Sequence, residues 1–206
     1  MPRRSDHTRS EFIELVTTAA EALVAEPGDE RLSARAIARR IGYSPGSIYL
    51  AFDNLDDVIL HVNARTLERL HACIADSIAD ETDALTQVKQ AARAYITFAR
   101  NNPDLWRLCF EHAQPADRPT PEWLDRRIEA LVELILEPLA RAGGQASEPL
   151  TAAQALWAGI HGICILTLTG KLQLVGKQTT ESLTDALVSN YLRGAAQSSP
   201  GRHGCG

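Results

Sequence analysis

Apolar residues recur at intervals of three and four along most of this 206-residue chain, which is the period of an amphipathic α-helix. The first such run covers residues 9–26, with Phe12, Val16 and Leu23 on one face and glutamates on the other. Pro27 follows, in a Pro-Gly-Asp sequence that ends a helix. We therefore expect a first helix over residues 9–26 whose apolar face packs against the next elements.

Residues 33–52 predict two short helices joined by a tight turn. Ser33 is placed to cap the first helix, because its hydroxyl can accept from the free amides of the first turn. Gly42 follows the last apolar position, where a left-handed residue commonly ends a helix. Ser44 is placed to cap the second helix, and Pro45 stands where a missing N–H costs nothing. Helix, glycine-containing turn and helix is the layout of a helix-turn-helix DNA reader.

The rest of the chain also predicts helices, with no competing strand pattern and no internal repeat. The expected ranges are 55–80, 83–101, 103–110, 121–142, 151–171 and 180–193. Pro138 should kink the 121–142 helix or shorten its last turn, and the 55–80 helix is long enough to link two domains. We predict an all-α protein of about nine helices. Its three-helix DNA-binding domain covers residues 9–54, its larger helical domain covers 55–196, and residues 1–8 and 197–206 are flexible tails.

Positive charge gathers on the 33–52 segment although the chain as a whole is acidic. The sequence has 21 Lys and Arg residues against 26 Asp and Glu residues, a net charge of −5. By contrast, residues 31–52 contain no carboxylate and four arginines, which are Arg31, Arg35, Arg39 and Arg40. Phosphate neutralisation acts at short range, so this local charge bears directly on DNA binding. The alternative is a solvated helical hairpin, but the capping, turn and charge patterns agree on a DNA reader.

The polar arm at residues 1–8 carries two further arginines, Arg3 and Arg4. Arms of this kind can reach into a DNA minor groove, whose negative potential attracts arginine. A frayed terminus explains the same composition equally well, so both interpretations stay open.

The cysteines and the apolar segments indicate a cytoplasmic protein. Cys73, Cys109, Cys164 and Cys205 are widely separated and form no C-x-x-C pair. That spacing argues against a zinc or disulfide framework and favours reduced thiols, so no metal or other cofactor is expected. No apolar run follows the first residues, as a secretory signal would require. The most apolar stretch, residues 158–168, is too short to cross a membrane.

The chain from about residue 9 to residue 60 resembles the TetR family of bacterial transcriptional regulators. The motif that carries the resemblance is Ser33-x-x-x-Ile37-Ala38-x-x-Ile41-Gly42-Tyr43-Ser44-x-Gly46-Ser47-Ile48-Tyr49-x-x-Phe52, and it matches without a gap. Leu156-Trp157-Ala158-Gly159-Ile160-His161-Gly162 further resembles the Trp-x-x-x-His-Gly element of one class of TetR C-terminal domains. The resemblance implies an all-α homodimer in which residues 9–54 bind DNA and residues 55–196 bind a ligand and dimerise.

The same resemblance implies which residues meet DNA. The second helix of the motif, residues 44–52, would enter the major groove, and Ser47 and Leu50 are expected to face outward toward base edges. Arg35 could reach a guanine or a phosphate, because the guanidinium fork meets two guanine acceptors at once. Serine and tyrosine hydroxyls of the motif match positions that bind phosphates in the family. The expected DNA-binding residues are Ser33, Arg35, Ser44, Pro45, Gly46, Ser47, Tyr49 and Leu50.

Two positions depart from the family pattern. Leu50 and Ala51 stand where polar or aromatic residues are common, so thymine methyl contacts and DNA shape must carry more of the specificity. Leu55 stands where family members often place a phosphate-binding lysine, and two aspartates follow it. The helix that begins there can still offer its free amides to a phosphate.

The resemblance also implies a repressor that a small molecule releases from a palindromic operator. The dimer would set its two readers roughly 34–36 Å apart, one turn of B-DNA, and the ligand would move the 55–80 helix. The candidate ligand-binding residues are Trp106, Phe110, Trp123, Trp157 and His161. They favour an apolar or aromatic effector, although core or interface packing is the alternative for each. Residues 151–171, apolar on most sides, and 180–193 are expected to form the dimer interface as a four-helix bundle.

Two other classes of protein are less consistent with the sequence. Glu68 and His71 have the Glu-x-x-His spacing of a di-iron helical bundle, but such a site needs a second copy, which the chain lacks. No H-E-x-x-H, P-loop or G-x-S-x-G motif is present, so we do not expect an enzyme. A helical scaffold that binds protein through its helix-turn-helix is the third interpretation. DNA binding that weakens steeply with salt would separate the regulator from both.

Overall fold

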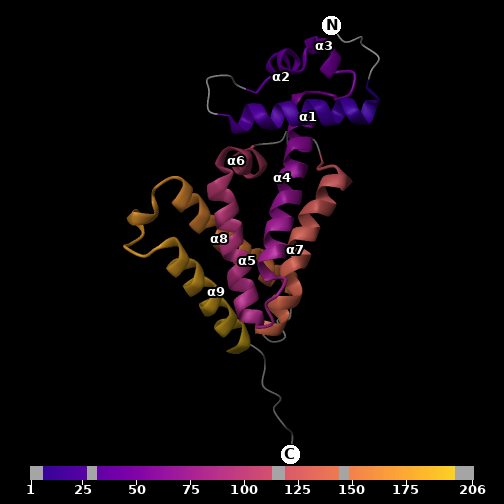
Figure 1. The fold of residues 1–206 in the computed structure, drawn as a ribbon. Coiled ribbons are helices and arrows are strands. Elements are labelled where there is room, and N and C mark those ends of the chain that lie inside the picture. The colour runs from indigo at the N-terminus through magenta and orange to yellow at the C-terminus, as the bar shows by residue number, and fades with distance from the viewer. Residues whose placement is uncertain (1–6, 27–31, 113–118, 144–148, 198–206) are drawn as a thin grey trace, which may run out of the picture. The chain divides into compact units, whose positions relative to one another are not determined.

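The computed structural model describes residues 7–26, 32–112, 119–143 and 149–197. Within these ranges the chain is helical and contains no strand (Figure 1). The α-helices are α1 (Arg9–Ala25), α2 (Ala34–Ile41), α3 (Pro45–Ile48), α4 (Leu55–Ile78), α5 (Ala84–Asn101), α6 (Pro103–Glu111), α7 (Glu122–Gly143), α8 (Pro149–Leu168) and α9 (Thr180–Gln197). A short 3-10 helix, η1 (Leu172–Leu174), lies between α8 and α9. The predicted all-α fold is confirmed; Arg3, Arg4, Arg31 and Cys205 lie outside the described residues.

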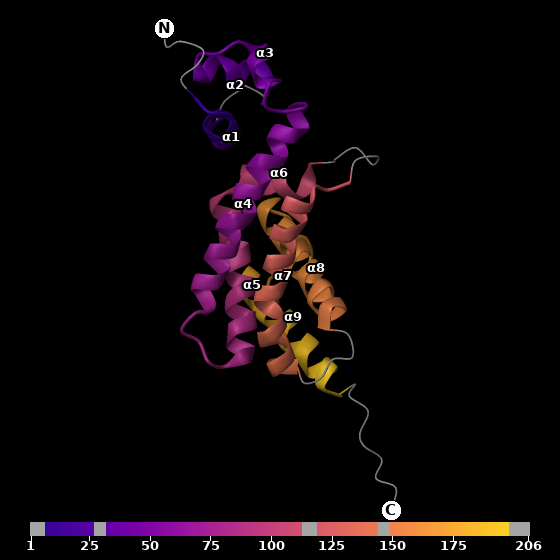
Figure 2. The same ribbon diagram turned by 90° about the vertical axis from the view of Figure 1, so that its right-hand side faces the viewer.

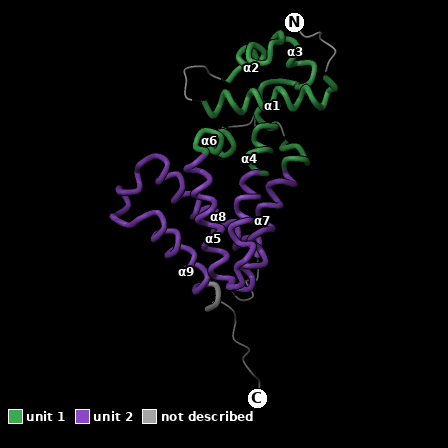
Figure 3. Tube along the Cα trace, viewed as in Figure 1, with its two compact units in different colours: residues 1–68, 102–124 green, residues 69–101, 125–206 purple. Residues whose placement is uncertain are grey.

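The chain divides into two compact units (Figure 3). Unit 1 comprises residues 1–68 and 102–124, and unit 2 comprises residues 69–101 and 125–206. Unit 1 therefore adds the first turns of α4, helix α6 and the start of α7 to the predicted 9–54 segment. The reason is a shared core, because Val58 and Val62 of α4 and Leu105 of α6 belong to the same buried cluster as residues of α1–α3.

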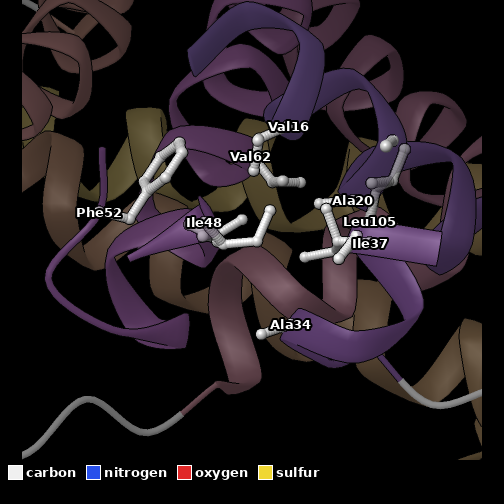
Figure 4. Close-up of a cluster of buried hydrophobic side chains, with 11 residues drawn as sticks. Val16, Ala20, Ala34, Ile37, Ile48, Phe52, Val62 and Leu105 are labelled. Atoms are coloured by element: carbon white, nitrogen blue, oxygen red, sulfur yellow. The ribbon is translucent and has the colours of Figure 1, made fainter. Parts of the chain in front are cut away.

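The core of unit 1 is built from the apolar faces that the sequence pattern predicts (Figure 4). Val16 of α1, Ile37 of α2 and Ile48 of α3 are completely buried, and Phe52 closes the cluster. Helices α2 and α3 lie together on one side of α1 in both views (Figures 1 and 2). Burying one such side chain stabilises the fold by roughly 1.5–3 kcal/mol, so these contacts fix the reader helices on α1.

Several helix ends differ from the expected ones. Thr8 is the N-cap of α1 rather than part of the arm, since its hydroxyl oxygen accepts from the Glu11 N–H at 3.3 Å and the Glu11 carboxylate accepts from the Thr8 N–H at 2.6 Å. Helix α7 runs through Pro138 to Gly143 instead of ending early. Pro138 and Leu139 are both buried, and tertiary packing of this kind holds a helical turn that has lost one backbone hydrogen bond.

The helices at the end of the chain also have shifted ends. Helix α4 ends at Ile78, and α9 continues to Gln197. Helix α8 begins at Pro149 and ends at Leu168. Just beyond it, Gly170 adopts a left-handed φ of 66°, and the Lys171 N–H donates to the Leu166 carbonyl at 2.9 Å. These bonds complete the helix before the expected end at residue 171.

Unit 2 is organised by α5, α8 and α9, which pack on one another (Figure 1). A Cβ added at Gly159 of α8 would lie 2.8 Å from a methyl carbon of Leu187, so the two helices approach closely here and a larger residue would require the Leu187 side chain to shift. Helix α9 is tied to α5 by a two-point ion pair between Arg93 and Asp185, with Nε 3.1 Å from Oδ1. The buried residues of these helices include Val88, Tyr95, Ala99, Ala153, Leu156, Ile160, Cys164, Val188 and Leu192.

Helix α8 is apolar but only partly buried in the single chain. With 20 residues and a mean hydropathy of 1.4 over an eighteen-residue window, it is long and apolar enough to cross a membrane by length and composition only. Core helices of soluble proteins meet the same criterion, and α8 packs on α5 and α9. Only 28% of that window is buried in the single chain, which leaves an apolar face uncovered by the described residues.

Candidate nucleic-acid interface

The helix-turn-helix begins with the capping geometry that the sequence predicts. The Ser33 hydroxyl oxygen accepts from the Ala36 N–H at 3.2 Å, which caps α2. Gly42 ends α2 with a left-handed φ of 75°, and the Tyr43 N–H donates to the Ala38 carbonyl at 2.9 Å. Because only glycine adopts this φ without strain, Gly42 sets the sharp turn between α2 and α3.

Helix α3 is shorter than the predicted 44–52 helix, and the serines at and near its start, Ser44 and Ser47, make contacts that the sequence did not predict. It ends at Ile48, after which the N–H groups of Leu50 and Ala51 donate to carbonyls three residues back at 3.2 and 3.1 Å. The predicted hydroxyl cap by Ser44 is absent. Its oxygen lies 2.9 Å from the Ser47 hydroxyl instead, and Ser47 is only 4% exposed. The expectation that Ser47 faces outward is therefore wrong, since its side chain is buried and its hydroxyl bonds that of Ser44.

Contacts with α1 hold the turn and the segment after α3 in place. The rings of Phe12 and Tyr43 meet edge to face with centroids 5.1 Å apart. At the other side, Arg9 Nη2 donates to the Ala51 carbonyl at 3.3 Å. The buried side chains of Ile48 and Phe52 anchor the same segment in the core of unit 1. Contacts at three places therefore hold the helix-turn-helix, residues 33–52, in position in the free chain.

The opposite face of this segment is exposed. Leu50 is 76% exposed and Tyr49 is 52% exposed, so both present large apolar surfaces to solvent. Ser44, Pro45 and Gly46, at the start of α3, are exposed as well. A short helix with its apolar anchor on one side and a leucine and a tyrosine on the other has the shape that a major-groove reader needs.

The predicted arginine patch is divided by an ion pair. Arg40 donates through both Nη atoms to the Glu26 carboxylate at 2.8 and 2.5 Å. These hydrogen bonds lower the pKa of the Glu26 carboxyl below its ordinary value and raise that of the Arg40 guanidinium. Arg35 is exposed and makes no ion pair with any described residue, and Arg39 is exposed as well. Arg40 therefore has its charge paired with a carboxylate of α1's C-cap, whereas the exposed Arg35 remains available to a phosphate.

A second set of ion pairs ties α4 to α1 within unit 1. Arg65 Nη1 donates to the Thr18 hydroxyl at 3.0 Å and to the Glu21 carboxylate at 3.2 Å, and Nη2 donates to the Glu14 carbonyl at 3.3 Å. The Glu14 carboxylate pairs with the same guanidinium. Burial lowers the pKa of Arg65, but the hydrogen bonds to Glu14 and Glu21 outweigh it and raise the pKa. This contact fixes α4 to the helix that carries the reader.

The first turn of α4 uses its acidic residues internally. The Asn54 carboxamide oxygen accepts from the Asp57 N–H at 2.9 Å, and an Asp57 carboxylate oxygen accepts from the Asp53 N–H at 3.2 Å. Asp56 Oδ1 lies 3.2 Å from Nε2 of His112, at the end of α6. Asn54 thus caps the start of α4, Asp57 binds back to the preceding backbone, and Asp56 joins α4 to α6.

The candidate ligand-binding residues divide between the two units. In unit 1, the rings of Trp106 and Phe110 lie 5.3 Å apart on α6, and Trp106 is completely buried. Trp123, at the start of α7, has its ring 4.9 Å from that of His61, which in turn meets Phe52 at 5.2 Å. An aromatic series therefore runs from the end of the helix-turn-helix through α4 to α7.

In unit 2, His161 joins α8 to α5. Its Nδ1 lies 2.7 Å from the hydroxyl of Tyr95, a buried residue, and its ring lies 4.9 Å from that of Trp157. Trp157 is 43% exposed on the apolar helix α8. These contacts are consistent with packing as well as with ligand binding, so the ligand-binding roles of all five residues stay predictions.

Three functional contacts were missed from the sequence. Arg9, Glu26 and Arg65 each bond a residue more than ten positions away. Only Arg65 had a sequence signal, because its partners Glu14, Thr18 and Glu21 recur at helical spacing along the polar face of α1. The partners of Arg9 and Glu26 depend on the turn geometry around α3 and α2.

Two family models match the chain. The model described as "Bacterial regulatory proteins, tetR family" matches residues 16–62, which include α2, α3 and the start of α4. The model described as "Tetracyclin repressor-like, C-terminal domain" matches residues 88–191, from α5 into α9. Together they account for both the helix-turn-helix and the helical remainder.

Curated and solved proteins give a consistent comparison. The nucleoid occlusion factor SlmA of Haemophilus influenzae (strain PittGG) is 27% identical over 104 residues, which cover 48% of this chain and 46% of SlmA. The chain thus spans about half the length of the curated relatives it matches. A protein of unknown function from Rhodococcus sp. RHA1 superposes with a TM-score of 0.73 at 22% identity, covering 95% of this chain and 100% of that one. FadR from Bacillus subtilis, solved in complex with stearoyl-CoA, gives a TM-score of 0.63 at 16% identity, covering 88% and 98%. At these identities the solved structures show a shared fold.

Proposed function

This chain belongs to the TetR family of bacterial regulatory proteins, and we propose that it is a repressor released from a palindromic operator by a small, apolar molecule. Membership makes it a DNA-binding transcriptional regulator. The observation that carries the proposal is that Arg35 of α2 and Tyr49 and Leu50 after α3 are all exposed on the helix-turn-helix. An exposed basic side chain and exposed apolar residues in one motif fit combined phosphate and base-edge contact.

On DNA, the segment from Ser44 to Leu50 would occupy the major groove. Leu50 would contact thymine methyl groups, with Pro45 and Gly46 close to the bases, and Tyr49 would offer its hydroxyl to a phosphate. The remaining contacts would come from Ser33, Ser44 and Arg35, all outside the buried face of the motif. Ser47 would act by holding the Ser44 hydroxyl in place.

The proposed effector is a small molecule of apolar character. The structural relative FadR from Bacillus subtilis was solved with stearoyl-CoA, a molecule with a long apolar chain. The aromatic residues Trp106, Phe110 and Trp123 of unit 1 are suited to the same chemical character. Trp157 and His161 of unit 2 are the further candidates.

We propose that α8 and α9 form the dimer interface. Helix α8 is the most apolar helix, yet only 28% of its membrane-length window is buried in the single chain, and Trp157 is exposed. Two helices from each of two copies would cover that face as a four-helix bundle. Light scattering should find a dimer for the natural protein and a monomer for Trp157→Asp. Leu174→Asp, at a leucine that is exposed in η1 and lies outside both helices, is the control and should stay dimeric.

Two measurements test the regulator. DNase footprinting on the promoter region of its own gene should protect a palindromic site, and affinity should fall steeply as salt rises. Added protein should lower the transcript from that promoter in vitro, as expected of a repressor. The proposal fails if no site is protected at low salt, or if added protein raises the transcript. A soluble regulator of this kind would act in the cytoplasm, where the chromosome lies.

A further inference from the structure

Two buried side-chain oxygens in the described part of the chain accept no hydrogen bond, Oδ1 of Asn63 and Oε1 of Gln90. Gln90 is a half-buried residue, whereas Asn63, on α4, is only 4% exposed. The four other buried polar residues all have partners within 3.0 Å, which are Ile13 for Thr17, Ser44 for Ser47, Val62 for Thr66 and Thr180 for Thr184. Asn63 is the exception among the buried polar residues of the described chain.

An unpartnered amide at this position costs stability. Asn63 lies on the buried stripe of α4 with Ile59, Leu67 and Leu70, all at most 5% exposed. A leucine would fit the surroundings, whereas a buried polar atom without a partner loses its bond to water and gains nothing in return. A cost of this kind in a folded protein calls for an explanation, and a ligand that supplies the missing partner is one.

We propose that Asn63 is the polar anchor of the effector site and that its carboxamide oxygen accepts a hydrogen bond from the effector. This inference rests on the proposed ligand-controlled repressor and names the chemistry of its ligand. Since the oxygen is an acceptor, the effector must bring a donor, such as a hydroxyl, an amide N–H or an amine. The neighbouring leucines and isoleucine require the rest of the molecule to be apolar.

The position of Asn63 explains how such a ligand would reach the reader. Val62, the preceding residue, belongs to the core that holds α1–α3, and Arg65 of the same turn binds α1. Successive residues of an α-helix are about 100° apart around its axis. One turn of α4 therefore carries all three groups, with Asn63 about 100° from Val62 and about 160° from Arg65 around the helix axis. A shift of that turn would move the core contact and the ion pair together with the ligand anchor.

The first test needs no ligand. Asn63→Leu should raise the melting temperature of the free protein, because it replaces an unpartnered buried amide by an apolar group of similar size. A lower melting temperature would overturn the proposal, since it would show that Asn63 already has a structural partner such as a bound water.

The second test compares two probes of equal size, n-decanol, which has a hydroxyl donor, and methyl nonyl ether, which has none. Release of own-promoter DNA, followed by fluorescence anisotropy, should require roughly tenfold more ether than alcohol in the natural protein. Asn63→Leu should respond to both alike. Ile78→Val, an apolar change at the last residue of α4 and away from the proposed site, is the control and should keep the tenfold difference.

The outcomes separate this inference from the proposed function. If the natural protein binds its promoter but responds equally to both probes, or to neither, the role of Asn63 is refuted and the DNA-binding regulator stands. If the protein does not bind its promoter without probes, the proposed function fails first. If the natural protein binds its promoter and is released at lower concentrations of the alcohol than of the ether, and only Asn63→Leu loses this difference, the results support both the role of Asn63 and the proposed function.

Discussion

Arg35 and Arg40 stand on the same helix of the reader but should contribute very differently to DNA binding. Arg35 is exposed and unpaired among the described residues, whereas Arg40 donates two hydrogen bonds to Glu26. Arg35→Gln removes one positive charge that is available to a phosphate. The double variant Glu26→Gln/Arg40→Gln removes a pair whose net charge is zero. The two changes thus test whether the ion pair or the arginine count decides affinity.

The expected magnitudes follow from counterion release. Each phosphate contact contributes about 0.9 to the slope of log affinity against log salt on duplex DNA. Arg35→Gln should lower that slope by about 0.9, so its affinity deficit shrinks roughly 3.5-fold between 50 and 200 mM salt. The double variant should leave the slope unchanged. If Arg35 instead binds a guanine, its loss should cost roughly 1–3 kcal/mol and relax specificity at one base pair.

Fluorescence anisotropy with a labelled operator over a range of salt measures both quantities. Circular dichroism should first show that both variants keep the helical content of the natural protein. The reasoning is refuted if the double variant loses as much slope as Arg35→Gln. That result would mean that Arg40 leaves Glu26 and contacts a phosphate in the complex.

The remaining predictions concern stability and thiol chemistry. Gly42→Ala should destabilise the protein by about 1–2 kcal/mol through backbone strain alone, because no atom lies within 4 Å of the added Cβ. Gly46→Ala is the control without a positive φ and should not lower the urea midpoint; equal losses would contradict this account. Burial raises the pKa values of Cys109 and Cys164 to about 12, so at pH 8 about one thiol in ten thousand is ionised. Iodoacetamide should label both, by peptide mass spectrometry, only after denaturation, and labelling of the native protein would refute the burial argument. Because the pKa of Glu26 is lowered on folding from 4.5, the stability advantage of the natural protein over Glu26→Gln should hold above about pH 4.5 and vanish as the pH falls through the lower folded value. An advantage that persists at pH 2 would contradict it.

Helix α2 and both of its ends were predictable because local chemistry decides them. Ser33 caps α2 and Gly42 ends it in the left-handed conformation, as their positions beside the apolar stripe predict. Ile37, Ile48 and Phe52 recur at helical spacing and are buried together. Caps, stop residues and stripes act within one or two turns, so each is legible in a short window of sequence.

The charges and hydroxyls at the site were decided by tertiary contacts. The sequence predicted that the charge of Arg40 is available to a DNA phosphate, but in the fold Arg40 pairs with Glu26, fourteen residues earlier. Ser47 was expected at base edges but is buried, with its hydroxyl bonded to that of Ser44. Neither outcome follows from periodicity, which gives the apolar face of a helix but not the partner of a polar side chain.

The sequence by itself determined the all-α class, the helix-turn-helix and the family, because these depend on spacing, capping and an ungapped motif. Only the tertiary structure decided which polar groups are satisfied. Arg65 was shown to bind α1, whereas Asn63, two positions earlier on the same helix, was left without a partner. A hydrogen bond requires two groups to meet within about 3 Å. For residues far apart in the chain, the packing of the helices sets that distance.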